Sequence, residues 1–199
     1  RTKASALTEG EAHLFDVKET HLYIPRSRIG SQPKGNMGAQ YYTAENPPFG
    51  AIIRYYLSEG LESLREERRT RERAVQANGG DNPYPSWERL RREDREEAPS
   101  IALIVEDDEG RTLRRLEGPT GKGLHTVSWD LRLPAPDPVE LGGNGFRAPW
   151  SSEPEGPLVT PGTYQVRLAK RIDGTLTELA GPVSVTLESL TFDSVLVAE

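Results

Sequence analysis

The chain has 199 residues, of which 35% are hydrophobic and 28% charged, and its 19 glycines and 16 prolines indicate a turn-rich globular protein with a hydrophobic core. Its net charge of −6 argues against a nucleic-acid partner, and its lack of long apolar runs argues against membrane insertion. The absence of cysteine excludes disulfides, thiol catalysis and thiolate metal ligands.

Residues 1–48 are expected to form a linker segment. The chain starts with Arg1 rather than methionine, and residues 1–11 lack the apolar core of a signal peptide, so we expect a fragment of a longer chain whose missing signal says nothing about secretion. Residues 12–24 contain a short β-like stretch. Residues 25–48 are rich in Pro, Gly, Ser and Asn, as in an irregular connector.

The stretch ENPPFGAIIRYYL at residues 45–57 stiffens the chain just before a strand. Pro47 and Pro48 each fix φ and lack an N–H, and each pushes the residue before it into extended geometry. The corner therefore sets the direction in which residues 51–57 enter the fold. Because their β-branched and aromatic side chains point to both faces, we predict a strand covered on both sides and an architectural role for the corner.

Residues 61–97 carry nine arginines and ten acidic residues. They predict two charged helices, broken at 78–80 (NGG) and 82–83 (NP), with Ser86 as the N-cap of the second helix. An Arg-rich binding arm is the functional alternative. Because the interleaved acids cancel its field, we favour a solvated helical insertion or a flexible excursion.

Two favourable i,i+4 pairs are expected on these helices. Glu67 precedes Arg71 by four residues, and Glu88 precedes Arg92 by the same spacing. Each pair is expected to stabilise its helix by a few tenths of a kcal/mol, ~0.2–0.5.

From residue 99 onward, apolar and polar residues alternate as in strands with one buried face. Turns separate these runs: 107–110 with Gly110 in a left-handed conformation, a type II turn at 161–162 and a tight hairpin at 173–174. Several short strands between such turns indicate an antiparallel β-sandwich. The predicted inward-facing residues are Ile101, Leu103, Val105, Val127, Trp129, Leu131, Tyr164, Val166, Leu168, Val183, Val185 and Leu187.

Three stretches carry a resemblance to a known family. VEDDEGRTLRRLEGPTGKGLHTVSWDLR (105–132), followed by VTPGTYQVRL (159–168), resembles the Ig-like domain of flagellar hook-capping proteins, with a D-x-x-G hairpin, a V-x-W-D strand and P-G-T-Y. Joined to ENPPFGAIIRYYL, it is similar to the C-terminal region of secreted bacterial sortilin-like or neuraminidase-repeat β-propeller proteins, often labelled glycosyl hydrolases. The resemblance covers about residues 49–187, outside the charged insertion and the 134–157 loop.

The resemblance implies an antiparallel Ig-like or fibronectin-III-like β-sandwich at residues 49–199, with a charged helical insertion at 61–97. Residues 1–48 would lead away from an N-terminal propeller. The resemblance also implies an extracellular, periplasmic or cell-envelope location. Any hydrolase activity would lie in the propeller, because a sandwich offers no natural cleft in which two carboxyls face each other.

The residues themselves suggest no catalytic or metal site. His13, His21 and His125 lack a metal-binding spacing, and Ser128 lacks the elbow motif of a nucleophile. Residues 106–109 are acidic and lie at a hairpin, where loosely bound Ca²⁺ is the alternative to a solvated turn, which we favour. We therefore expect no enzyme activity in this chain, no metal and no cofactor.

Four aromatic residues lie in insertions rather than in strands. Trp87 and Tyr84 belong to the charged segment, and Phe146 and Trp150 belong to the Pro/Gly-rich loop at 134–157. Loops of this length inside a compact domain are usually functional, docked or disordered. Such side chains bind glycans, anchor their own loop or dock against a neighbouring domain, and we favour docking. We expect a non-catalytic accessory domain that packs against or projects the β-propeller of the same chain; the alternative is a carbohydrate-binding module of a glycoside-hydrolase-like parent.

Overall fold

The computed structural model describes residues 10–23, 48–136 and 155–189 and confirms a mostly-β fold with two sheets. The predicted binding residues Phe146 and Trp150 lie outside the described residues. The described elements are, in chain order, β1 (Ala12–Leu14), β2 (Thr20–Leu22), β3 (Ala51–Leu57), α1 (Leu64–Ala77), α2 (Trp87–Arg95), β4 (Ser100–Glu106), β5 (Thr112–Gly118), β6 (Gly123–Trp129), β7 (Gly162–Ile172) and β8 (Thr175–Ser189).

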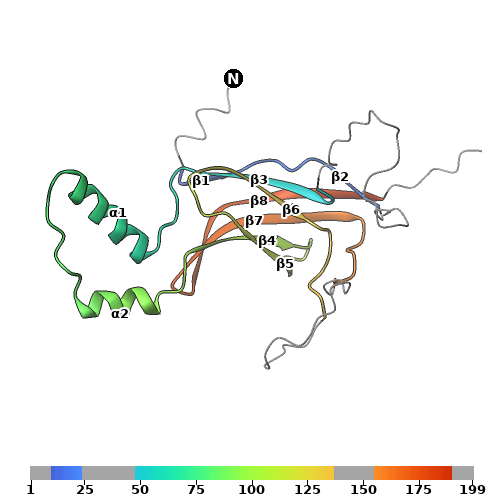
Figure 1. Cartoon of the computed structure of the whole chain (residues 1–199). Coiled ribbons are helices and arrows are strands. Elements are labelled where there is room, and N and C mark those ends of the chain that lie inside the picture. Colours follow the sequence, from blue (N-terminus) through green and yellow to red (C-terminus); the bar gives the residue numbers. More distant parts are fainter. Residues whose placement is uncertain (1–9, 24–47, 137–154, 190–199) are drawn as a thin grey trace, which may run out of the picture.

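The two sheets lie one above the other (Figure 1). One has three strands in the order β1-β3-β6, and the other has five in the order β2-β8-β7-β4-β5 and curls into a half-barrel. The pairings are antiparallel except for β2 and β8, which run parallel, so the predicted all-antiparallel arrangement needs this correction. No hairpin joins β2 to β8, because β2 belongs to the N-terminal segment and β8 is the last strand. The antiparallel direction that a hairpin imposes therefore does not apply to this pair.

Residues 10–23 therefore contribute a strand to each sheet. The strands β1 and β2 have only three residues each and little apolar character, so alternation in the sequence gave only a weak signal for them. The predicted domain boundary at residue 48 is not tested by this pairing, because a strand that joins a sheet can still lead out of another domain.

The sheets share one hydrophobic core between their inner faces. Trp129 is fully buried, as predicted, and packs edge-to-face against Tyr164 of the opposite sheet, with ring centroids 5.4 Å apart. Such a pair adds to the large area that an indole buries. The fully buried side chains include Ile53, Tyr55, Leu57, Ile101, Leu103, Val105, Leu131, Val166, Leu168, Val185 and Leu187.

The strand β3 is buried on one face only. Ile53 and Tyr55 point into the core, whereas Arg54 is exposed and Ile52 and Tyr56 are half-buried. The prediction that both faces are fully covered is wrong, because only one face of β3 meets the other sheet and the second, with Ile52, Arg54 and Tyr56, is at most half-buried. A run of β-branched and aromatic residues does not by itself distinguish a half-buried strand from a fully covered one.

Two of the predicted turns are confirmed. Gly110 has φ +77° in the hairpin between β4 and β5, and Asp173 and Gly174 have φ +48° and +74° between β7 and β8, the two positive values of a type I′ turn. The type II turn predicted at 161–162 does not form. Gly162 is instead the first residue of β7, with φ +156°.

The chain enters β3 through a tight contact with the end of β6. Gly50 has φ +107°, and a Cβ there would lie 1.8 Å from the carbonyl oxygen of Trp129, so only glycine fits. The Ser128 hydroxyl donates to the carbonyl oxygen of Phe49 at 2.8 Å. These contacts fix the direction of entry and support the architectural reading of the stretch that includes Pro48.

Candidate docking site on the helical arm

The helices α1 and α2 and the loop 78–86 between them form an arm that extends beyond one end of the sheets (Figure 1). The loop lies at the end of the arm far from the sheets. Two helices broken by Asn/Gly/Pro residues were predicted here, and the structure confirms them. Neither helix is long and apolar enough to cross a membrane.

Side-chain caps define where both helices begin. The Ser63 hydroxyl accepts from the Glu66 backbone N–H at 3.3 Å, and the Glu66 carboxylate accepts from the Ser63 backbone N–H at 2.9 Å, which is a capping box. The predicted cap Ser86 is confirmed, because its hydroxyl accepts from the Arg89 backbone N–H at 3.3 Å.

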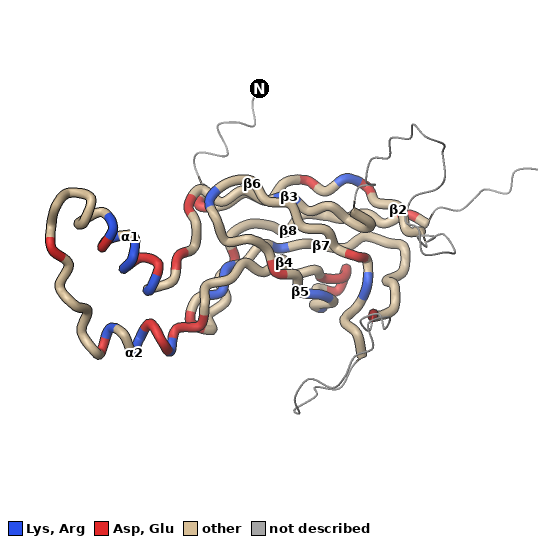
Figure 2. The backbone as a smooth tube through the Cα atoms, viewed as in Figure 1, with Lys and Arg blue, Asp and Glu red and all other residues tan. Residues whose placement is uncertain are grey.

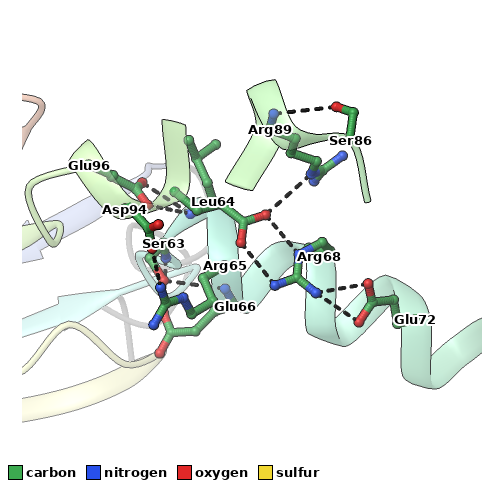
Figure 3. A network of polar contacts seen from close by, with 11 residues as sticks. Ser63, Leu64, Arg65, Glu66, Arg68, Glu72, Ser86, Arg89, Asp94 and Glu96 are labelled. Atoms are coloured by element: carbon green, nitrogen blue, oxygen red, sulfur yellow. Dashed lines mark hydrogen bonds and ion pairs between the residues drawn. The ribbon is translucent and has the colours of Figure 1, made fainter. Parts of the chain in front are cut away.

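An ion-pair cluster joins the two helices (Figure 3). The Arg68 guanidinium on α1 donates two hydrogen bonds to Glu93 on α2, at 2.8 and 2.9 Å, and a further bond to Glu72 at 2.9 Å. Arg89 reaches the same Glu93 carboxylate at 3.4 Å. The side chain of Glu93 is 1% exposed, and its hydrogen bonds from Arg68 hold its pKa below the ordinary value of 4.5.

The base of the arm is also held by polar contacts. The Glu96 carboxylate accepts from the Leu64 backbone N–H at 2.8 and 3.0 Å, so the end of α2 caps the start of α1. Arg65 pairs with Asp94 at 2.8 Å across the same junction. The start of α1 and the end of α2 therefore lie close together, on the side of the arm next to the sheets. Glu97, just after α2, pairs with Arg171 of β7 at 2.5 Å.

The predicted pairs Glu67–Arg71 and Glu88–Arg92 are not among the ion pairs that the described helices make. The i,i+4 pairs formed are Arg68–Glu72 and Arg89–Glu93, one residue further along each helix. The reason is tertiary: Arg68 of one pair and Glu93 of the other also bond to each other across the two helices. Figure 2 shows both signs of charge along both helices, as the sequence predicts.

The far end of the arm presents two aromatic side chains to solvent. Tyr84 is 77% exposed, and Trp87, the first residue of α2, is 71% exposed. Their rings lie 6.4 Å apart in an edge arrangement. Beside them, between the helices, is a hollow of ≈ 380 Å³ whose lining includes Arg71, Val75 and Tyr84. Of the predicted binding residues, Trp87 alone falls within the described part of the chain.

In the acidic hairpin between β4 and β5, the Asp107 carboxylate forms hydrogen bonds within its own turn. Asp107 accepts from the backbone N–H groups of Glu109 and Arg111 at 3.0 and 2.8 Å, and from the Arg111 guanidinium at 2.7 Å. These bonds occupy the carboxylate that the calcium alternative requires, and they favour the reading of this turn as structural. The bonds from Arg111 hold the pKa of Asp107 below its ordinary 3.8, against the opposing effect of burial.

Two features of the structure were not predicted from the sequence. One is a hollow of ≈ 890 Å³ lined by residues 15–23 and the outer face of β3, which includes Ile52 and Arg54. The other is a cluster of Glu19, His21 and Glu188. Glu188 is far from the other two in the chain, and only the pairing of β2 with β8 brings them together, so no spacing rule could have found them.

Comparison with known proteins adds no relative. No family model, no curated protein and no solved structure matches this chain.

Proposed function

We propose that this chain is a non-catalytic, Ig-like accessory domain that packs against or projects a β-propeller of the same protein, and that the Tyr84–Trp87 pair is its docking surface. The propeller context and an extracellular or cell-envelope location come from the sequence resemblance. The observation that carries the docking role is the exposure of two large aromatic side chains at the end of an arm that polar contacts hold in place.

The Ig-like assignment is supported by one hydrogen bond in the core. The Tyr164 hydroxyl donates to the carbonyl oxygen of Thr160, four residues upstream, at 2.6 Å. This is the geometry of a tyrosine corner, which recurs in Ig-like sandwiches at the start of a strand. The packing of Trp129 on Tyr164 between two sheets supports the same assignment.

Docking is supported by the way the arm is built. Soluble proteins rarely gather large exposed aromatics without an interaction to serve, and Tyr and Trp are enriched at the centres of interfaces. The bidentate Arg68–Glu93 pair and the Glu96 cap hold the helices that present them. An arm ordered before binding loses less entropy when the neighbour arrives.

The non-catalytic assignment is supported by how polar groups are used. Asp107 in the acidic hairpin is saturated by the turn and by Arg111, and the Ser128 hydroxyl bonds a backbone carbonyl. These are structural roles for two of the groups that the sequence analysis weighed as chemical candidates.

Carbohydrate binding is the second candidate. The hollow beside Tyr84 also has Arg71, Asp81 and Asn82 in its wall, so it offers polar hydrogen-bonding groups next to an aromatic face. That combination of a few polar groups and aromatic surface is typical of small-ligand sites.

The test is hydrogen exchange on the full-length protein and on the 199-residue chain alone. We expect the amides of residues 80–90 to be protected in the full-length protein relative to the isolated chain, and Trp87→Ala to remove that protection. Leu124→Ala, which trims another exposed apolar side chain on β6, is the matched control and should leave it unchanged.

Equal exchange in both forms contradicts docking through the arm. A glycan array on the isolated chain then decides the second candidate: saturable binding that Trp87→Ala weakens supports a carbohydrate-binding module. A flat array removes it.

A further inference from the structure

We propose that Glu19, His21 and Glu188 form a binding site for a divalent transition metal, with Zn²⁺ as the best match, that ties β2 to β8. One ligand atom from each of the three side chains lies within 4.8 Å of the others. This site is independent of the proposed docking function.

Strand pairing places the three side chains together. β2 runs parallel to β8, with His21 as the register partner of Glu188. Glu19 lies just before β2, two residues from His21, and its carboxylate oxygen lies within 4.8 Å of a His21 ring nitrogen. Strand register therefore sets the His21–Glu188 pair, and Glu19 joins it from the residue that precedes the strand.

The separation of the ligand atoms suits a zinc ion after small side-chain rotations. Zn²⁺ binds imidazole nitrogen and carboxylate oxygen at about 2.0–2.2 Å, which places tetrahedral ligands about 3.4 Å apart. All three side chains are exposed, so rotation costs little and the fourth position is open to water. The imidazole selects zinc over Ca²⁺ and Mg²⁺, which take oxygen ligands.

The two carboxyls already crowd each other. The Glu19 and Glu188 carboxylate oxygens lie within 4.8 Å of each other, so two like charges repel at this site. A bound cation replaces this repulsion by attraction. Lys18 and Arg54 line the same hollow as Glu19 and His21.

The metal would stabilise one of the two shortest strand pairings among the described residues. The strand β2 has three residues and lies at the edge of its sheet, so few backbone hydrogen bonds hold it. A ligand from each of two strands closes the loop between residues 19 and 188 across most of the chain. The metal would then fix the point at which residues 20–22 join the five-stranded sheet.

The test is isothermal titration of the chain with Zn²⁺ alone at pH 7.5. We expect one saturable site, with affinity reduced at least about tenfold by His21→Ala and by Glu188→Gln, since even groups that only support ligands contribute that much. His13→Ala and Glu117→Gln, which remove a histidine and an exposed acid elsewhere, should leave affinity unchanged. Ca²⁺ should bind far more weakly than Zn²⁺.

Thermal unfolding supplies a second readout that does not depend on the titration. Without metal, Glu188→Gln should raise the midpoint slightly, because it removes the carboxylate repulsion. With Zn²⁺ the wild type should gain more stability than the variant. No saturable Zn²⁺ binding by the wild type, or binding that His21→Ala leaves intact, would overturn the proposal.

Discussion

The sheets and the helical arm are held together by different forces. Between the sheets, Trp129, Ile53 and Leu103 are fully removed from water and close one apolar core. In the arm, no residue of α1 is buried, and the buried side chain of α2 is the charged Glu93. The sheets therefore fold by apolar burial, whereas the helices keep their places through caps and charge-assisted hydrogen bonds.

This difference assigns the stability of the fold to the sheets and the presentation of an exposed surface to the arm. Apolar burial grows with area and makes the two sheets one cooperative unit. Polar contacts add little net free energy, because water competes for the exposed ones and desolvation offsets the buried Arg68–Glu93 pair, but they fix direction. An arm of this kind is suited to holding a surface such as Tyr84 and Trp87 away from the core without being needed by it.

The largest expected effect is in the core. Trp129→Ala should lower the free energy of unfolding by about 3–5 kcal/mol, because it removes a fully buried indole and its contact with Tyr164 and leaves a cavity. Urea denaturation followed by circular dichroism measures it. Leu124→Ala, at an exposed site, is the control. A loss below about 1 kcal/mol would mean that the indole is not a core residue.

The next effect is a pH dependence of the sheets. Tyr55 is fully buried, its hydroxyl donates to the Pro119 carbonyl at 2.6 Å, and burial raises its pKa from 10.0 to about 12. The unfolded state ionises first, so this contribution is complete below pH 10 and is lost as the pH rises to 12.

We expect wild type to lose on the order of 2 kcal/mol more than Tyr55→Phe between pH 9 and pH 12. Urea titrations at both pH values measure the difference. Parallel losses in the two proteins would show that the Tyr55 hydroxyl reaches water.

The contacts of the helical arm should weaken at low pH, whereas the Tyr55 contribution to the sheets is lost at high pH. The pKa of Glu93 is lowered by its hydrogen bonds from Arg68, so its contribution is present above the ordinary value of 4.5 and is lost as the pH falls through the folded value. Glu93→Gln should speed hydrogen exchange in α1 and α2 at pH 7 while the exchange of β4 and β7 stays the same.

The matched control for that experiment is Glu67→Gln, on an exposed part of α1. It should leave exchange in both helices close to wild type. If Glu93→Gln instead lowers protection in the sheets by the same factor as in the helices, the arm and the core are one unit and the comparison fails.

The smallest expected effect is that of Trp87→Ala. Because this side chain is 71% exposed, its loss should change the free energy of unfolding by no more than about 0.5 kcal/mol. Urea denaturation beside Trp129→Ala measures it. A larger loss would mean that Trp87 supports the arm rather than presenting a surface.

The alternation of apolar and polar residues, together with turn-forming residues, predicted most of the β-structure. Trp129, Val185 and Leu187 were assigned inward from period-two patterns, and Asp173 with Gly174 gave the hairpin, because these signals are local. The parallel pairing of β2 was missed because it depends on strands far apart in the chain. The single buried face of β3 was missed because composition does not report which layer a strand joins.

The candidate sites divide in the same way. Trp87 could be singled out from the sequence, because a tryptophan within a charged segment has no apolar face of its own to join. The grouping of His21 with Glu188 could not, since it is created by tertiary pairing. The partner of Arg68 was also hidden: many acids were available, and only the packing of the helices selects Glu93.

The most direct test of the division between core and arm is to remove the arm. Residues 64–96 would be replaced by a short Gly-Ser linker, which the junction of Leu64 with Glu96 allows, while the contacts of Leu61 with Thr120 and of Glu97 with Arg171 stay. We predict one cooperative thermal transition with a midpoint within about 3 °C of wild type. Loss of cooperative unfolding, or a fall of more than about 10 °C, would show that the sheets need the arm and would contradict the account.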